Sequence, residues 1–119
     1  MSSTPKMTLD EEIAAAIAIV RVGLNQLRDA ATRTDDLGPH AAALRALRDY
    51  TNPNAGVLAA IADTIGTITI SITEIDDKVI GDVEEQLEEA QAYAQDYTGT
   101  HIDRALELLA PLLSQEENR

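Results

Sequence analysis

The strongest constraint on the fold is an apolar face that runs from residue 57 to residue 97 with the periodicity of an α-helix. When successive residues are placed 100° apart, its side chains fall within one arc of about 140°. One helix over residues 54–97 would be a rod roughly 60 Å long, and such a face must be covered by this chain or by a second one. The face consists of Val57, Leu58, Ile61, Ile65, Ile68, Ile72, Ile75, Val79, Ile80, Val83, Leu87, Ala90, Tyr93, Ala94 and Tyr97.

One stretch of this face, residues 67–73, has a second interpretation. Its sequence Thr-Ile-Thr-Ile-Ser-Ile-Thr alternates with a period of two and is rich in β-branched residues, as in a strand. We predict helix, because the 3.6-residue periodicity enters and leaves the stretch in phase. Gly99 is expected to end the long helix as a left-handed cap.

Shorter helices are predicted before and after the long one. Thr8 and Glu11 have the spacing of a capping box at the start of the first helix. A second helix spans about 39–50, and a last one begins near Thr100, where Pro111 is expected to kink or end it. The first helix has a narrow apolar stripe, with which we expect it to cover part of the long helix: Leu9, Ile13, Ile17, Val20, Leu24, Leu27 and Ala31.

These elements predict an all-α fold, a bundle of about four helices around one long helix at about 54–97. We expect a single helical domain over residues 8–113, with a disordered N-terminus at 1–7 and a disordered tail at 114–119. The short helices leave the C-terminal half of the long apolar face uncovered, so we predict a homodimer. The predicted self-association residues are Ile72, Ile75, Val79, Val83 and Leu87.

The net charge of −12 is concentrated in the second half of the chain. Residues 1–59 carry six Lys/Arg and seven Asp/Glu, whereas residues 60–119 carry three and fourteen. Such a surface repels nucleic acids and anionic membranes, so we expect neither as a direct partner, whereas a basic protein would be attracted. The predicted acidic partner face consists of Glu74, Asp77, Asp82, Glu84, Glu85, Glu88 and Glu89.

The sequence offers few residues for chemistry. It contains no Cys, and neither His40 nor His101 has a His or Glu three or four residues away that is placed to share a metal. We therefore expect no catalytic site, no metal and no cofactor. The segment 1–7 lacks the apolar core of a signal peptide, and we expect a cytoplasmic protein.

Three functions remain open. The leading one is a non-enzymatic interaction or assembly protein that self-associates through the long apolar face. The alternative is an inhibitor whose rigid line of carboxylates imitates the phosphate backbone and occupies a basic nucleic-acid-binding protein. A second alternative is a magnesium-dependent, all-α nucleotide pyrophosphohydrolase, which would use the pairs Glu74/Asp77 and Glu85/Glu88.

Overall fold

The computed structural model confirms the all-α fold. It describes residues 6–49, 51–52 and 54–118, and within these ranges it contains helices and connecting turns but no strand. Residues 1–5 of the predicted disordered N-terminus and Arg119 of the predicted tail lie outside the described residues. The helices are α1 (Leu9–Thr32), α2 (Leu37–Leu47), α3 (Val57–Thr73), α4 (Ile80–Ala92), the π-helix η1 (Tyr93–Tyr97) and α5 (Thr98–Glu117).

The chain divides into two compact units, Met1–Asp35 and Asp36–Arg119. The first contains α1, whose N-cap is Thr8 as predicted: the Thr8 hydroxyl accepts a hydrogen bond from the Glu11 N–H at 3.1 Å. The same hydroxyl donates to the Glu11 carboxylate at 3.2 Å. The single domain over 8–113, and the covering of a long helix by the first one, stay predictions.

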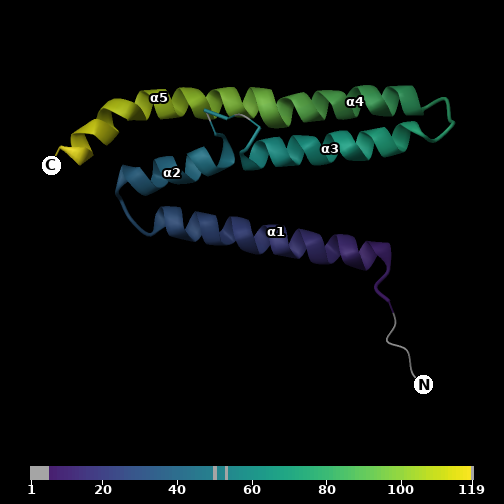
Figure 1. The fold of residues 1–119 in the computed structure, drawn as a ribbon, viewed down its shortest axis with the longest axis horizontal. Helices are drawn as coiled ribbons and strands as arrows, with labels where there is room; N and C mark the ends of the chain where they lie inside the picture. Colours follow the sequence, from purple (N-terminus) through teal and green to yellow (C-terminus); the bar gives the residue numbers. More distant parts are fainter. Residues whose placement is uncertain (1–5, 50, 53, 119) are drawn as a thin grey trace, which may run out of the picture. The chain divides into compact units, whose positions relative to one another are not determined.

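The predicted long helix at 54–97 is wrong. The structure has two helices in this range, α3 and α4, which are joined by a turn over residues 74–79 and lie antiparallel, side by side (Figure 1). The stretch 67–73 belongs to α3, so the prediction of helix over strand there is confirmed. One periodic face has thus been folded into a hairpin, whose two arms cover each other.

Local chemistry explains why the helix breaks where it does. Glu74, Asp76 and Asp77 follow one another at the C-terminal end of α3, where the helix dipole disfavours negative charge. The Asp77 carboxylate also accepts a hydrogen bond from the Val79 N–H at 2.9 Å, a local bond that competes with helix formation. The turn also allows the apolar side chains of both arms to leave water together.

The most deeply buried side chains of α3 are small ones rather than its isoleucines. Ala59, Ala62 and Thr69 are the buried residues of α3, and the Gln91 side chain of α4 lies against Gly66. Small side chains let two helices approach closely, and the larger Ile61 and Ile68 are left exposed. The buried face of α3 is therefore rotated from the predicted one.

The longest continuous helix of the structure is formed by α4, η1 and α5, over residues 80–117 (Figure 1). The prediction that Gly99 ends a helix as a left-handed cap is wrong, because Gly99 is a helical, buried residue of α5. Pro111 lies inside α5, which bends in its C-terminal part and continues to Glu117. Residues 114–117, which we predicted to be a tail, are therefore helical.

The short helix α2 packs against α5 and the start of α3. Ala41 of α2 and Leu106 of α5 are buried in this contact region. At the other end of α5, the Glu116 carboxylate accepts hydrogen bonds from the Leu37 N–H at 3.0 Å to each oxygen. This carboxylate satisfies a free N–H at the start of α2, where negative charge also complements the helix dipole.

Candidate functional site

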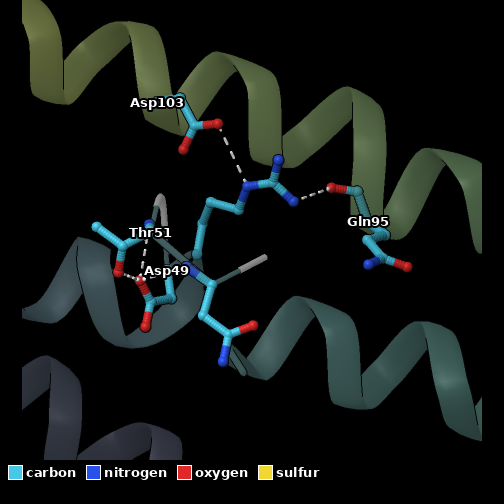
Figure 2. Close-up of polar contacts among 6 residues, drawn as sticks. Asp49, Thr51, Gln95 and Asp103 are labelled. Carbon is cyan, nitrogen blue, oxygen red and sulfur yellow. Dashed lines mark hydrogen bonds and ion pairs between the residues drawn. The ribbon is translucent and has the colours of Figure 1, made fainter. Parts of the chain in front are cut away.

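A largely buried polar contact, which we name the Arg48 joint, connects the end of α2 to the continuous helix of α4, η1 and α5. Arg48 donates from Nε to the Asp103 carboxylate at 3.3 Å and from Nη1 to the Gln95 carbonyl at 3.2 Å (Figure 2). Only 12% of the Arg48 side chain and 16% of the Asp103 side chain are exposed. Because the ion pair lies largely out of water and connects the end of α2 to α5, we assign it a structural role.

Two features of the continuous helix of α4, η1 and α5 accommodate the Arg48 side chain. Gly99 lies directly under the guanidinium, where an added Cβ would come within 2.7 Å of the Arg48 Cζ and Nε atoms. Gln95, whose carbonyl accepts from Arg48, is part of the π turn, in which the Thr98 N–H bonds the Tyr93 carbonyl five residues back. Sequence patterning gave no signal for either feature.

A second polar cluster lies in the connection between α2 and α3. The Asp49 Oδ1 atom accepts hydrogen bonds from the Thr51 hydroxyl at 2.8 Å, the Thr51 N–H at 3.0 Å and the Asn52 N–H at 3.1 Å (Figure 2). The Thr51 hydroxyl bond and the backbone bonds stabilise the charged carboxylate and hold the pKa of Asp49 below its ordinary value. The cluster shapes the turn between α2 and α3.

The opposite side of the long helix carries a row of aromatic side chains. Tyr93, Tyr97 and His101 are four residues apart, and they stand two positions from Gln95, Gly99 and Asp103, hence about 200° around the helix. The two tyrosine rings meet edge to face with centroids 5.7 Å apart, and the Tyr97 and His101 rings do so at 4.8 Å. Both tyrosines are 61% exposed, so the row is a surface feature.

This aromatic row borders an open pocket of about 580 Å³. Two carboxylate side chains, Glu89 and Asp96, line the pocket together with the aromatic rings. Among the residues that the structure describes, no Lys or Arg lines it. We name it the aromatic–acidic pocket, and its full lining is Glu89, Ala92, Tyr93, Asp96, Tyr97, Thr100 and His101.

This pocket is not predicted from the sequence, because Tyr93 and Tyr97 fall on the apolar arc of the predicted helix 54–97. The usable signal was the Tyr-Tyr-His spacing of four residues, which places the rings on one side of a helix. Glu89 was predicted as part of the acidic face, and the structure places it in the pocket beside the rings.

The predicted self-association residues do not share one surface in the structure. Ile72, Val83 and Leu87 are half-buried in the α3–α4 hairpin. Ile75 and Val79 lie in the turn between the two helices and are 58% and 59% exposed. Self-association through these residues stays a prediction, although three of them already contribute to the fold of one chain.

The predicted acidic face is divided by the same turn. Glu74 and Asp77 lie in the turn, whereas the other five residues lie on α4, where Glu84 is half-buried and the rest are exposed. A straight line of carboxylates from 74 to 89 therefore does not form. Within the described part of the chain, no three His, Asp or Glu side chains lie close enough together to hold a metal ion.

The most exposed apolar surface belongs to α1. None of its residues is buried, and all its large apolar side chains except the half-buried Leu27 are between 40% and 76% exposed. Within the described residues, none of the helices combines the length and the apolar character needed to cross a membrane. The exposed apolar side chains of α1 are Leu9, Ile13, Ile17, Ile19, Val20, Val22 and Leu24.

Comparison with known proteins supplies no relative from which a function could be carried over. No protein family, no curated protein and no solved structure matches this chain.

Proposed function

We propose that the chain is a non-enzymatic, cytoplasmic assembly protein that self-associates through α1. The observation that carries the proposal is the exposed apolar stripe of this helix, where Ile13, Ile17, Val20 and Leu24 follow one another at spacings of four, three and four residues. This is the spacing with which two helices pack side chains into each other's grooves. The proposal replaces a dimer built on the helix 54–97.

The apolar stripe is large enough to support a pair of helices. The 24 residues of α1 form a rod about 36 Å long. If pairing removed the exposed parts of about five such side chains per copy from water, it would contribute roughly 10 kcal/mol. Association costs at least about 4 kcal/mol in lost freedom, so we expect a pair of moderate, concentration-dependent affinity.

The charges of α1 favour an antiparallel pair. Asp10, Glu11 and Glu12 lie in its first turn, whereas the later part is net basic, with Arg21 and Arg28 against the single acid Asp29. Two antiparallel copies place the acidic start of each helix beside the basic part of the other. Two parallel copies would place like charges together at both ends.

Single cysteines test this arrangement directly, because the natural chain contains none. We expect Ile13→Cys alone to form few disulfides with itself under mild oxidation, and likewise Leu24→Cys and Ala31→Cys alone. A mixture of Ile13→Cys with one of the other two should form the mixed disulfide. An antiparallel pair brings position 13 of one copy beside position 24 or 31 of the other.

One outcome would contradict the antiparallel arrangement, and another would contradict self-association through α1 itself. Efficient disulfide formation by Ile13→Cys alone would indicate a parallel pair. No disulfide in any mixture, together with a monomeric mass, would mean that α1 does not bind a second copy. Ala18→Cys serves as the matched control, because position 18 lies on α1 but outside the apolar stripe.

The magnesium-dependent hydrolase is less well supported by the geometry. Of the pair Glu74/Asp77, the Asp77 carboxylate is used in the turn by the Val79 N–H. Glu85 and Glu88 are exposed on α4. The divided acidic face likewise weakens the imitation of a phosphate backbone, which needs a rigid, continuous line of charge.

A further inference from the structure

We infer that the aromatic–acidic pocket binds the guanidinium group of an arginine side chain from a basic protein segment. The inference goes beyond self-association and does not depend on α1, since every residue that lines the pocket lies between Glu89 and His101. It assigns a specific recognition site to the acidic half of the chain.

The aromatic rings provide the first part of the argument. Tyr93 and Tyr97 contact each other edge to face, at an interplanar angle of 70°, so the pair does not stack its faces together. The face of a tyrosine ring attracts a cation that lies within about 6 Å of its centre. A planar guanidinium stacks on such a face better than an ammonium group does.

The carboxylates provide the second part. Glu89 and Asp96 border the same pocket, and a guanidinium that lies on a ring can donate paired hydrogen bonds to a carboxylate. The charges of the chain as a whole point the same way, because fourteen Asp/Glu and three Lys/Arg occupy residues 60–119. An anionic ligand would meet repulsion here, both in the pocket and on approach.

The shape of the pocket provides the third part. Its lining residues come from one continuous run of α4, η1 and α5, so it is an open recess rather than an enclosed cavity. Such a recess leaves a small molecule largely in water, whereas a side chain that projects from an extended segment can lie along it. Its volume of about 580 Å³ is ample for an arginine side chain.

The test uses the full chain and a short peptide of alternating arginine and glycine, followed by NMR of the tyrosine ring protons. The chain has three tyrosines, two histidines and no Trp or Phe, so few aromatic ring signals compete with those of the tyrosines. We expect binding that shifts two of the three tyrosines. A lysine peptide of the same charge should bind about three- to fivefold more weakly.

Variants separate a specific site from general charge attraction. Tyr97→Leu keeps the net charge and should weaken binding about three- to fivefold. Glu89→Gln with Asp96→Asn should weaken it more than the matched pair Glu85→Gln with Glu88→Gln, which removes the same charge from exposed positions of α4 outside the pocket. Circular dichroism verifies that each variant keeps its helical structure.

The proposal is overturned if the peptide does not bind. It is also overturned if Tyr97→Leu binds as the natural chain does, or if both carboxylate pairs weaken binding equally, since the peptide would then follow net charge alone. All these variants should keep the oligomeric state of the natural chain. Peptide binding and self-association through α1 are then tested independently of each other.

Discussion

Replacement of Gly99 by alanine tests the Arg48 joint, which holds α2 against the continuous helix of α4, η1 and α5. In an ordinary helix this change stabilises the protein by about 1 kcal/mol, because glycine has the greater freedom in the unfolded chain. At Gly99 the new Cβ would lie within 2.7 Å of the Arg48 guanidinium, which would have to move. Its bonds to Asp103 and to the Gln95 carbonyl would then be lost.

The size of the effect follows from these bonds. A hydrogen bond to a charged group contributes about 1.5 kcal/mol or more, so the loss of two costs roughly 3 kcal/mol. Subtraction of the helix-propensity gain leaves Gly99→Ala destabilised by roughly 2 kcal/mol. Gly81 in α4 is the matched control, because an added Cβ there meets no atom of the described residues within 4 Å. We expect Gly81→Ala to be neutral or stabilised by up to about 1 kcal/mol.

Urea unfolding followed by helical circular dichroism measures both variants. A double-mutant cycle with Arg48→Ala isolates the cause, because Gly99→Ala should become neutral or stabilising once the guanidinium is gone. The reasoning is refuted if Gly99→Ala is as stable as Gly81→Ala. It is also refuted if Gly99→Ala costs the same with and without Arg48.

Three further predictions concern other local features. Gly56→Ala should destabilise by about 2–3 kcal/mol in urea unfolding, because its Cβ would lie 2.6 Å from the Leu47 carbonyl oxygen, a backbone atom that cannot rotate away; a neutral variant would contradict this contact. Thr8→Ala should cost about 1 kcal/mol through loss of the N-cap and fray the start of α1, as amide hydrogen exchange would show; unchanged protection would contradict the cap. Because the folded state lowers the pKa of Asp49 from its ordinary value of 3.8, the ionised carboxylate stabilises the folded state above pH 3.8. This stabilisation is lost as the pH falls below that value. The difference in melting temperature between Asp49→Ala and the natural chain should therefore shrink on acidification, and a pH-independent difference would count against the bonds to Thr51.

The sequence predicted the helical class and several boundaries well, because these depend on local chemistry. Thr8 and Glu11 marked the start of α1, and the capping bond is observed. The β-branched stretch 67–73 was correctly predicted as helix, since its apolar residues continue the 3.6-residue periodicity on both sides. These features require no knowledge of distant contacts.

The predicted long helix at 54–97 is wrong because periodicity does not distinguish a straight rod from a hairpin. An apolar face on each arm has the same pattern whether the chain continues or turns back. The run of acids at 74–77 was visible in the sequence, but its effect as a helix end was outweighed by the periodicity. In the hairpin Ala62 is buried and the Gln91 side chain lies against Gly66, and a pattern of large apolar residues could not reveal either feature.

The aromatic–acidic pocket and the Arg48 joint depend on tertiary structure. Arg48 meets Asp103 across 55 positions of sequence, and no local pattern links the two. The opposite faces of one helical segment then acquire separate roles, a buried attachment for α2 and an exposed aromatic row. The sequence supplied the acidic residues, and only the structure showed which of them lie beside Tyr93 and Tyr97.

The measurement that tests the central claim most directly is the molar mass in solution by light scattering, over a range of protein concentrations at low and high salt. We predict a rise with concentration toward twice the chain mass of 12.8 kDa at both salt levels, because apolar contacts resist screening. Ile17→Asp with Val20→Asp should remain at the chain mass. A natural chain that stays at 12.8 kDa throughout, or a variant that still doubles its mass, would contradict self-association through α1.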